Sequence, residues 1–377
     1  MNFFEKYNWA EILAAHPAEN CEIAEYHKIL CPPDDYPDFL DKYIALPIMQ
    51  RLKGVGLLCG TDWTPLYRNR FFYSRLEHSI AVALIVWHFT HSKAQTLAGL
   101  FHDVSTPVFS HAQDFRKGDA LTQTTTEAPT SAILRKSREL SALLDADGLD
   151  VSQVEDYHAY PVADNEIPRL SADRLEYMFP SGLVFDGSWT LQEIRRVYDD
   201  IAVLKNEDDE PELGFLTQDA AELYCERFCM ISHILQLNEN KLTLQMLAQI
   251  TSLAEKTGIL QEDDFMRLSE VQIIRRLEDF CDCQTAAEKS CGNADEKYLA
   301  RLFRTFRQMT KIEHKNSPLA DDEYFNVCVK VKQRYINPLV ALPHKTARLS
   351  EISQKSAKII ADFLAYNDTP YGCVKLI

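Results

Sequence analysis

The 377-residue sequence predicts a mainly α-helical fold with a small module of strands and helix near its C-terminal end. Apolar residues recur with the period of an α-helix through most of the chain, most clearly in residues 75–90. One late segment, residues 324–331, instead alternates apolar and polar side chains, which is typical of a strand. With 46% hydrophobic and 25% charged residues, the chain can bury a sizeable core.

The segment from 75 to 90 predicts a helix near the centre of the core. Its apolar side chains form a wide stripe, which implies burial on most sides. The stripe consists of Leu76, Ile80, Val82, Ala83, Val86 and Trp87. A second helix is predicted over residues 94–104, ending before Pro107 because proline disfavours helix in the residue ahead of it. The pair His102 and Asp103 is therefore expected at a helix C-terminal turn.

The rest of the chain predicts further helices and two connections. Residues 116–130 are polar and rich in threonine, which indicates a surface loop that could close over a site. The acidic run 207–210, followed by Pro211, indicates a solvated connection. Further helices are expected over residues 131–144, 167–178, 190–204, 219–237, 241–256, 262–280, 296–309 and 349–364.

Four parts are expected from this order of elements. An N-terminal helical segment spans residues 1–43, and residues 44–185 form the domain that carries the polar motifs described below. A helical extension covers residues 186–320, and the small strand-and-helix module covers residues 321–377. The chain shows no internal repeat and no low-complexity tract, which argues against a repeat architecture.

The formal net charge of −16 and the isoelectric point near 5.2 indicate an acidic surface. Such a surface repels nucleic-acid phosphates and anionic membranes, although a bound cation can invert the potential within one pocket. The N-terminal segment lacks the features of a secretory signal and no apolar stretch is long enough to cross a bilayer, so a cytoplasmic protein is expected. Ten cysteines without a Cys-x-x-Cys pair indicate reduced core thiols. The oligomeric state is left open, with a homo-oligomer as one alternative.

Four polar residues are candidate ligands of a divalent cation: His78, His102, Asp103 and Asp173. Neutral imidazole and carboxylate suit intermediate divalent metals, and two of each leave positions open for water and substrate. Neighbouring residues of a regular helix point about 100 degrees apart, but at a helix end His102 and Asp103 can converge on one ion. A lone histidine on an apolar helix is more often a hydrogen-bonded core residue, so the four residues indicate a metal site only when they are taken together.

The segments around these residues, taken jointly, resemble a known family. They read QRL at 50–52, RLEHS at 75–79, HDVSTPVFSH at 102–111 and DRLEY at 173–177. The order His, His-Asp, Asp resembles the HD superfamily of metal-dependent phosphohydrolases, and most closely its deoxynucleoside triphosphate (dNTP) triphosphohydrolase branch. The resemblance spans residues 44–177, with further matches at 334–340 and 348–352. It implies a mainly helical HD-domain fold and one divalent metal ion, either Mn, Fe, Co, Ni, Zn or Mg, held by the four residues.

The resemblance also implies a reaction and a set of residues that bind the substrate. The metal would polarise a phosphate oxygen and activate water for hydrolysis of a phosphate ester or anhydride, with a nucleotide as the favoured small-molecule substrate. Arg51, Arg75, Arg174 and Tyr177 stand at positions expected to contact that substrate, since arginine is suited to bidentate binding of phosphate oxygens. Each arginine could instead form a structural ion pair with a neighbouring acid.

Two positions depart from the family pattern. Thr106 and Thr126 replace histidines that assist proton transfer there, and a threonine hydroxyl does not titrate near neutral pH. The candidates for proton transfer are then Asp114 and Glu127, while His111 is either catalytic or orients the loop after the His-Asp turn. The missing histidines also argue against a dinuclear centre.

Three functions remain open from the sequence. The favoured one is a metal-dependent phosphohydrolase, because the four ligands would leave open coordination positions that a purely structural ion does not need. The alternative is a catalytically attenuated protein that binds a nucleotide or metal in a regulatory role, which the two threonines favour. The third is an interaction module that acts through the helices of residues 190–309 and the late strand.

Overall fold

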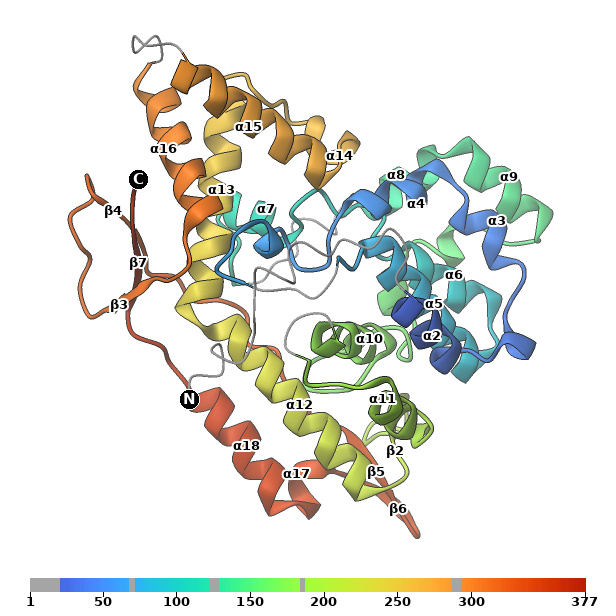
Figure 1. Cartoon of the computed structure of the whole chain (residues 1–377). Coiled ribbons are helices and arrows are strands. Elements are labelled where there is room, and N and C mark those ends of the chain that lie inside the picture. The colour runs from blue at the N-terminus through green and yellow to red at the C-terminus, as the bar shows by residue number, and fades with distance from the viewer. Residues whose placement is uncertain (1–20, 68–71, 122–128, 184–186, 287–292) are drawn as a thin grey trace.

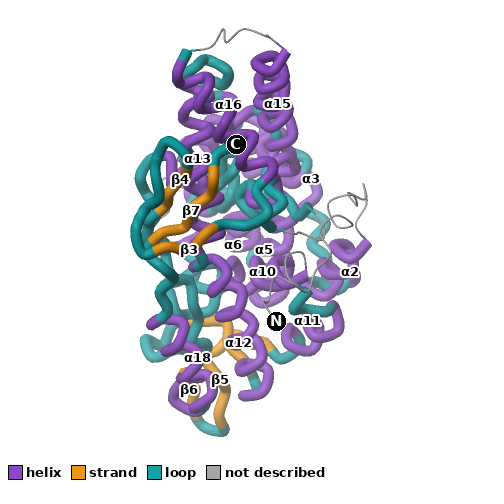
Figure 2. Tube along the Cα trace, turned by 60° about the vertical axis from the view of Figure 1, so that its left-hand side comes forward, coloured by secondary structure: helices purple, strands orange, loops and turns teal. Residues whose placement is uncertain are grey.

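The computed structural model describes residues 21–67, 72–121, 129–183, 187–286 and 293–377. Helices make up most of the elements in these ranges, and the strands form two small sheets. Figure 1 shows the sheets at two separate places on a helical body, and Figure 2 shows the same separation from another side. The predicted mainly helical class is therefore confirmed.

Helix α5 (Arg75–Thr90) is a core helix whose bounds agree with the predicted range. It begins at Ser74, whose hydroxyl accepts a hydrogen bond from the backbone N–H of Glu77. The carboxylate of Glu77 in turn accepts from the backbone N–H of Ser74. This reciprocal cap fixes where the helix starts and therefore where His78 projects, one turn later.

Helix α6 (Lys93–Phe101) packs along α5. Gly99 faces α5 closely, since a β-carbon at this position would lie 3.4 Å from side-chain atoms of that helix. The helix ends at Phe101, with His102 as its C-terminal cap and Asp103 next in the chain. The predicted place of this pair, at a helix end, is confirmed.

Helix α10 (Ala172–Ser181) packs against α5 and begins later than the predicted residue 167. Its start is set by Ser171, whose hydroxyl accepts from the backbone N–H of Arg174. Helix α2 (Cys21–Leu30) contacts α5 on another side and also packs against α11 (Leu191–Tyr198). Helices α2 and α10, which are far apart in the sequence, thus both pack against α5.

Two consecutive helices, α12 (Gln218–Gln236) and α13 (Asn238–Lys256), run one after the other along the body (Figure 1). Leu237 divides them with extended backbone angles. Helix α13 packs against α7 (His111–Arg116) and α16 (Ala294–Gln308). The remaining α-helices are α3 (Leu40–Ile44), α4 (Pro47–Gln50), α8 (Thr130–Lys136), α9 (Arg138–Ala146), α14 (Asp264–Arg267), α15 (Glu270–Ala286), α17 (Leu349–Ile352) and α18 (Gln354–Ala365).

Three predicted helices are each divided in two by a serine. Ser137 separates α8 from α9, Ser269 separates α14 from α15, and Ser353 separates α17 from α18. Each serine hydroxyl accepts a hydrogen bond from a backbone N–H in the first turn of the second helix. Serine competes for backbone hydrogen bonds in this way, so it ends one helix and caps the next.

The predicted helix over residues 190–204 is wrong in its second half. Helix α11 ends at Tyr198, and strand β1 (Ile201–Lys205) follows, paired antiparallel with β2 (Pro211–Phe215). The acidic run between them forms a hairpin turn in which the side-chain oxygen of Asn206 accepts two backbone N–H groups. A short apolar run fits the period of either a helix or a strand, and here the turn-forming residues that follow it favour the hairpin.

Both sheets join strands that are distant in the sequence. The first has the order β1-β2-β5-β6, with β5 (Leu339–Leu342) parallel to β2 and β6 (Lys345–Arg348) antiparallel to β5. The second has the order β3-β7-β4, formed by β3 (Glu313–Lys315), β4 (Tyr324–Val327) and β7 (Tyr371–Lys375). The strand predicted near residue 324 is confirmed for its first half, since β4 ends at residue 327.

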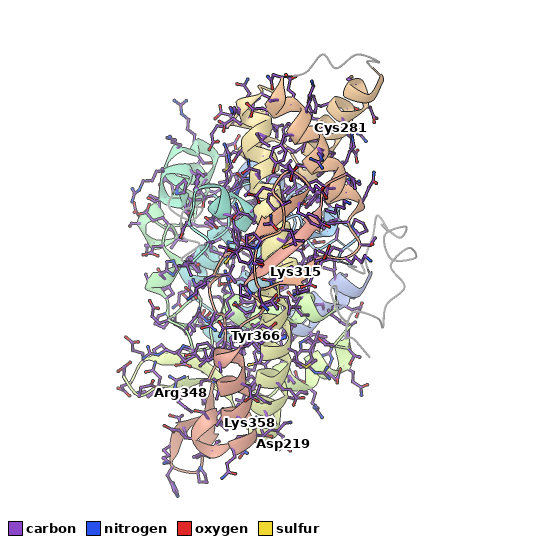
Figure 3. All side chains as sticks on the ribbon, turned by 90° about the vertical axis from the view of Figure 1, so that its left-hand side faces the viewer. Asp219, Cys281, Lys315, Arg348, Lys358 and Tyr366 are labelled. Atoms are coloured by element: carbon purple, nitrogen blue, oxygen red, sulfur yellow. The ribbon has the colours of Figure 1, made fainter. Side chains whose placement is uncertain are left out.

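The four-part division of the chain stays a proposal. Each sheet contains strands from both sides of the boundary proposed at residue 320, so the late module does not pair only with itself. Six of the eight cysteines whose side chains the structure describes are buried, and all eight are free, as expected for core thiols. Cys281 lies near the end of the molecule opposite to Arg348 (Figure 3). No helix within the described ranges combines the length and apolarity needed to span a bilayer.

Candidate metal centre

The structure brings the four predicted ligands together from three helices. His78 of α5 and the pair His102 and Asp103 after α6 are buried, and their ligand atoms all lie within 4.8 Å of one another. Asp173, in the first turn of α10, places Oδ1 3.2 Å from Nε2 of His78 and 3.8 Å from Nε2 of His102. The Asp173 side chain is 22% exposed, so the cluster has one side toward solvent.

The hydrogen-bond partners of the two imidazoles decide which nitrogen carries the proton. Nδ1 of His102 lies 2.7 Å from the carbonyl oxygen of Gly99, which can only accept, so Nδ1 is the donor. Nδ1 of His78 donates in the same way to the fully buried carboxylate of Glu176. In the neutral rings both Nε2 atoms therefore present lone pairs, although they lie 3.1 Å apart.

Carboxylate oxygens of Asp103 and Asp173 also lie close to the two Nε2 atoms. Oδ2 of Asp103 lies 3.7 Å from Nε2 of His78 and 3.5 Å from Nε2 of His102, and Oδ1 of Asp173 faces the same two nitrogens. Buried acceptors at such distances repel one another unless a cation or a proton lies among them. Two imidazoles and two carboxylates are also the donor set of intermediate divalent metals, so these residues fit one such ion.

The raised pKa of the His78 imidazole also shows that these acceptors favour a positive charge among them. Burial lowers the pKa of this imidazole, but the nearby carboxylates of Glu176, Asp173 and Asp103 outweigh burial and raise the pKa to about 10. When no cation is bound, a proton on Nε2 of His78 would thus reduce the repulsion between the neighbouring acceptor atoms. Metal binding must displace that proton, because only the neutral imidazole can act as a ligand.

Both aspartates are held in the ionised form. Burial raises the pKa of Asp103, but the guanidinium of Arg75 and the two histidines outweigh it and hold the pKa well below its usual range. The pKa of Asp173 is likewise lowered against burial, chiefly by its hydrogen bond with His78. Arg75 contacts Oδ2 of Asp103 at 2.8 Å, and both side chains are only 9% exposed. Its Nε atom is buried without a hydrogen-bond partner.

The other predicted substrate-binding arginines are engaged by the protein. Arg51 donates to the backbone carbonyls of Val104 and Thr106 at 2.6 and 2.8 Å, and burial lowers its pKa to about 10. It therefore holds the turn that follows the His-Asp pair. The hydroxyl of Thr106 donates to Oδ1 of Asp103 at 2.7 Å, so the residue in the place of a family histidine orients a candidate ligand.

Arg174 and Tyr177 lie on the same helix as Asp173. Arg174 forms an ion pair with Asp164 at 3.2 Å and donates to the backbone carbonyl of Arg169 at 2.8 Å. The guanidinium of Arg174 therefore stabilises the loop ahead of α10. Its predicted contact with a substrate stays a prediction. Tyr177 is half-buried, and burial raises the pKa of its hydroxyl to about 12, so it remains a neutral hydrogen-bonding group.

His111, Asp114 and Arg334 form a second polar group close to Tyr177. Nδ1 of His111 lies 3.0 Å from Oδ2 of Asp114, and the guanidinium of Arg334 donates to Nε2 of His111 across 3.4 Å. The charge of Arg334 also acts on Tyr177. No carboxylate pairs with Arg334 in the part of the chain that the structure describes. This contact between Arg334 and His111 was not predicted, since Arg334 was known only as part of a matching C-terminal stretch. The predicted proton-transfer residue Glu127 and its neighbour Thr126 lie outside the described residues.

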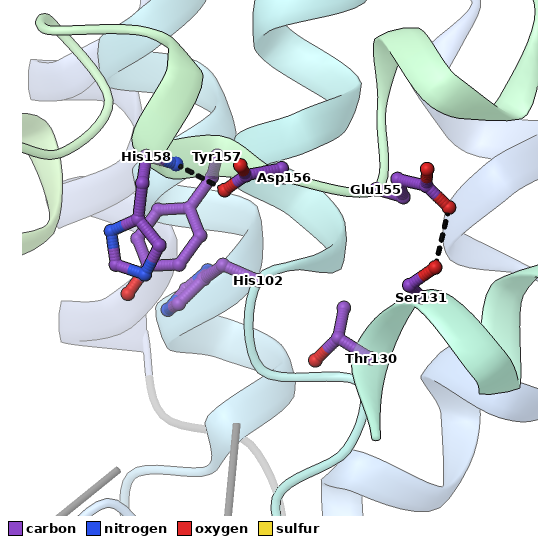
Figure 4. Close-up of a pocket in the computed structure, with 7 residues that line it drawn as sticks. All are labelled: His102, Thr130, Ser131, Glu155, Asp156, Tyr157 and His158. Carbon is purple, nitrogen blue, oxygen red and sulfur yellow. Dashed lines mark hydrogen bonds between the residues drawn. The ribbon is translucent and has the colours of Figure 1, made fainter. Parts of the chain in front are cut away.

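A pocket of about 290 Å³ adjoins the candidate ligands, because His102 is one of its lining residues (Figure 4). The ring of Tyr157 lies 5.1 Å from the ring of His102, centroid to centroid, and 4.2 Å from the ring of His158. These two aromatic residues belong to a single 3-10 turn, Tyr157–Ala159. No motif in the sequence indicated them, since only the fold brings this turn beside α6. The lining consists of His102, Thr130, Ser131, Glu155, Asp156, Tyr157 and His158.

The chain is similar to one protein in sequence and to two solved structures in fold, in each case over most of its length. The uncharacterized protein YdhJ of Bacillus subtilis (strain 168) is 23% identical over 324 residues, which cover 85% of this chain and 89% of that protein. The structure of a hypothetical protein from Aquifex aeolicus matches with a TM-score of 0.57 at 16% identity, covering 90% of this chain and 92% of that one. A phosphohydrolase from Bacteroides thetaiotaomicron VPI-5482 matches with a TM-score of 0.53 at 13% identity, covering 89% and 95%. No protein-family model matches the chain.

Proposed function

We propose that this protein is a metal-dependent phosphohydrolase of the HD type. One observation carries the proposal: the ligand atoms of His78, His102 and Asp103 converge, Oδ1 of Asp173 faces the two imidazole Nε2 atoms, and the second nitrogen of each histidine is already used by a protein acceptor. This arrangement is typical of a metal site whose ligands are oriented by outer partners. The shared fold with a phosphohydrolase of known structure agrees with the proposal.

A divalent ion held by these four residues would polarise a phosphoryl oxygen and lower the pKa of a water molecule. The protein's own groups then have separate tasks. Arg75 keeps Asp103 ionised, and Glu176 keeps Nδ1 of His78 protonated so that Nε2 faces the site. Arg334, whose guanidinium has no carboxylate partner in the described ranges, is the arginine proposed to bind a phosphate oxygen.

The proposed substrate is a phosphate ester or anhydride, with a nucleotide as the favoured class. Membership of the dNTP triphosphohydrolase-like branch and a cytoplasmic location are further parts of the proposal. The proton-transfer groups of that branch are replaced here, since Thr106 bonds to Asp103 instead of titrating. The same observation favours the second candidate function, a regulatory protein that binds metal or nucleotide with attenuated turnover.

The test is the release of phosphate, pyrophosphate and triphosphate from a nucleotide panel, with Mn, Fe, Co, Ni, Zn and Mg compared in parallel. The wild type is compared with Asp103→Ala and with Asp145→Ala, an exposed aspartate of α9 that serves as the matched control. Turnover that needs a metal and Asp103, but not Asp145, supports the enzyme, and the released product decides between nucleotidase and triphosphohydrolase. A wild type that binds an ion through Asp103 and still releases no product supports the regulatory function.

A further inference from the structure

The hydroxyl of Thr106, which stands in the place of a family histidine, contacts a candidate metal ligand. Resting on the proposed function, we propose that Thr106 is a positioning residue that restricts Asp103 to a single metal-binding oxygen. The centre then accepts small divalent ions, such as Mn²⁺, and disfavours large ones, such as Ca²⁺. The two oxygens of Asp103 have different partners, which makes them unequal toward an ion.

The turn from Asp103 to Thr106 is fixed by hydrogen bonds to its backbone. The backbone N–H of Thr106 donates to the carbonyl oxygen of Asp103 at 2.9 Å, which closes the turn. Arg51 donates from outside the turn to the carbonyl oxygens of Val104 and Thr106. Threonine is β-branched and its first side-chain torsion is restricted, so a fixed backbone also fixes where the hydroxyl points.

The hydroxyl of Thr106 holds the carboxylate of Asp103 in one rotation. It donates to Oδ1 at 2.7 Å, and both residues are buried. Oδ2 is the oxygen that faces the ring nitrogens, at 3.7 Å from Nε2 of His78 and 3.5 Å from Nε2 of His102. A chelating carboxylate presents both of its oxygens to the ion, and the bond between Thr106 and Oδ1 opposes the rotation that this would need.

Arg75 supports the same orientation of Asp103. Its guanidinium contacts Oδ2 at 2.8 Å. A carboxylate oxygen has two lone pairs, so Oδ2 keeps one lone pair for an ion while it accepts from Arg75. Together with Oδ1 of Asp173, which faces both Nε2 atoms, the four candidate ligands thus offer two nitrogen and two oxygen atoms.

This set of donor atoms decides which ions fit. Ca²⁺ takes about six to eight oxygen ligands and often gains two of them from one carboxylate. Intermediate ions such as Mn²⁺ and Co²⁺ need fewer oxygens, and four single-atom ligands leave a six-coordinate ion with positions for water and substrate. Loss of the Thr106 hydroxyl would free Oδ1 of Asp103 for chelation, so the preference for small ions should weaken.

The experiment compares Thr106→Val, which removes the hydroxyl, with wild type by calorimetric titration with Mn²⁺ and by competition of Ca²⁺ against Mn²⁺. We expect Mn²⁺ affinity to fall by about 10- to 100-fold and Ca²⁺ affinity to fall far less, so that Ca²⁺ competes better. Thr106→Ser restores the hydroxyl and should match wild type for both ions. Thr96→Val is the matched control, since this buried hydroxyl has no hydrogen-bond partner among the described residues.

The absorption bands of bound Co²⁺ give a second readout, because they depend on the number and arrangement of the ligand atoms. We expect these bands to change in Thr106→Val and to be retained in Thr106→Ser. Unchanged bands in Thr106→Val, or equal losses of Mn²⁺ and Ca²⁺ affinity such as a general loss of structure would give, would overturn the role of Thr106. A wild type that binds none of the three ions would instead overturn the proposed function itself.

Discussion

Glu176 accepts a hydrogen bond from Nδ1 of His78 while its own side chain is fully buried. The hydroxyls of Tyr26 and Tyr73 donate to the other carboxylate oxygen at 3.1 and 2.7 Å, so the acid is compensated on both sides. Asp173 stands three residues earlier on the same helix, which places both acids on one face. One turn of α10 therefore provides a candidate ligand and the group that orients another.

Replacing Glu176 with Gln should weaken metal binding by about 10- to 100-fold, because outer partners of ligating histidines contribute that much to affinity. The amide no longer stabilises the proton on Nδ1 of His78. Titration calorimetry with Mn²⁺ measures the change, and Tyr26→Phe serves as the control, since it removes one hydrogen bond to the same acid but keeps its charge. Equal Mn²⁺ affinity in Glu176→Gln and wild type would show that His78 is not a ligand.

Replacing Arg334 with Gln should raise the KM for a phosphate ester by about 10- to 100-fold, since a charge-assisted hydrogen bond contributes about 1.5–3 kcal/mol. Metal affinity should change little, because the residue contacts His111 and none of the four candidate ligands. The exposed Lys330→Gln removes a positive charge from the same stretch and is the control. If both variants show the same small change, Arg334 does not bind phosphate.

The stability of the protein should fall as the pH rises from about 5 to about 8. Burial and the nearby Asp62 raise the pKa of Glu270 to about 8, and burial raises that of Asp62 to about 6. A carboxyl whose folded pKa lies above its unfolded value stabilises the fold at low pH, and this contribution is lost as the pH rises through the folded pKa. Thermal unfolding followed by circular dichroism at several pH values measures the slope.

Asp62→Asn should flatten this dependence, since it removes one titrating group and the like charge that opposes ionisation of Glu270. At pH 8.5 the variant should be more stable than wild type by roughly 1–2 kcal/mol, or about 2–4 °C in Tm. Asp282→Asn, an exposed acid on the same helix as Glu270, is the control and should keep the slope of wild type. A parallel slope in Asp62→Asn would contradict the coupling of the two acids.

The second sheet should loosen as the pH rises above about 6.5. His314 of β3 bridges Glu239 of α13 at 3.0 Å and Asp368, just before β7, at 3.2 Å. Burial lowers its pKa, but the two acids outweigh burial and raise it, so the ion pairs are complete below the unfolded pKa of about 6.5 and are lost above the folded value. Hydrogen exchange in β7 should therefore quicken from pH 6 to pH 9.

His314→Gln should remove this pH dependence from β7, because the amide carries no charge at any of these pH values. The exposed His344→Gln, which lies in the turn before β6, should leave it unchanged. Hydrogen exchange followed by mass spectrometry on peptides that contain β7 compares the three proteins. A wild-type exchange rate that rises no more than the intrinsic chemical rate would argue against the ion pairs.

Much of the fold followed from local patterns. The bounds of α5 could be predicted from the helical spacing of its apolar residues, and the structure adds the reciprocal cap of Ser74 and Glu77 at its start. The hairpin of β1 and β2 was missed because the short apolar run at residues 201–205 fits the period of either a helix or a strand. The pairing of β2 with β5 could not be predicted, since pairing between distant strands leaves no local signal. Serines inside apolar runs, such as Ser353, divided helices that periodicity alone made continuous.

The candidate ligands were predicted because, together with their flanking residues, they resemble the pattern of one family. The groups that orient them were harder to predict. Glu176 lies within a matching motif, yet only the fold shows that it meets His78. Arg334 lies in a matching stretch, but that stretch is far from the His-Asp pair in the sequence, and only the fold brings Arg334 to His111.

The parallel pairing of Phe215 with Val340 has a consequence for how the protein is synthesised. When β1 and β2 have left the ribosome, the edge of β2 that receives β5 has no partner until the later segment is translated, so a nascent chain exposes a strand edge for that time. Arg334 emerges only a few residues before β5. Products of interrupted translation that end before Arg334 would thus retain the sequence positions of all four candidate metal ligands but would lack both β5 and the arginine proposed to bind phosphate.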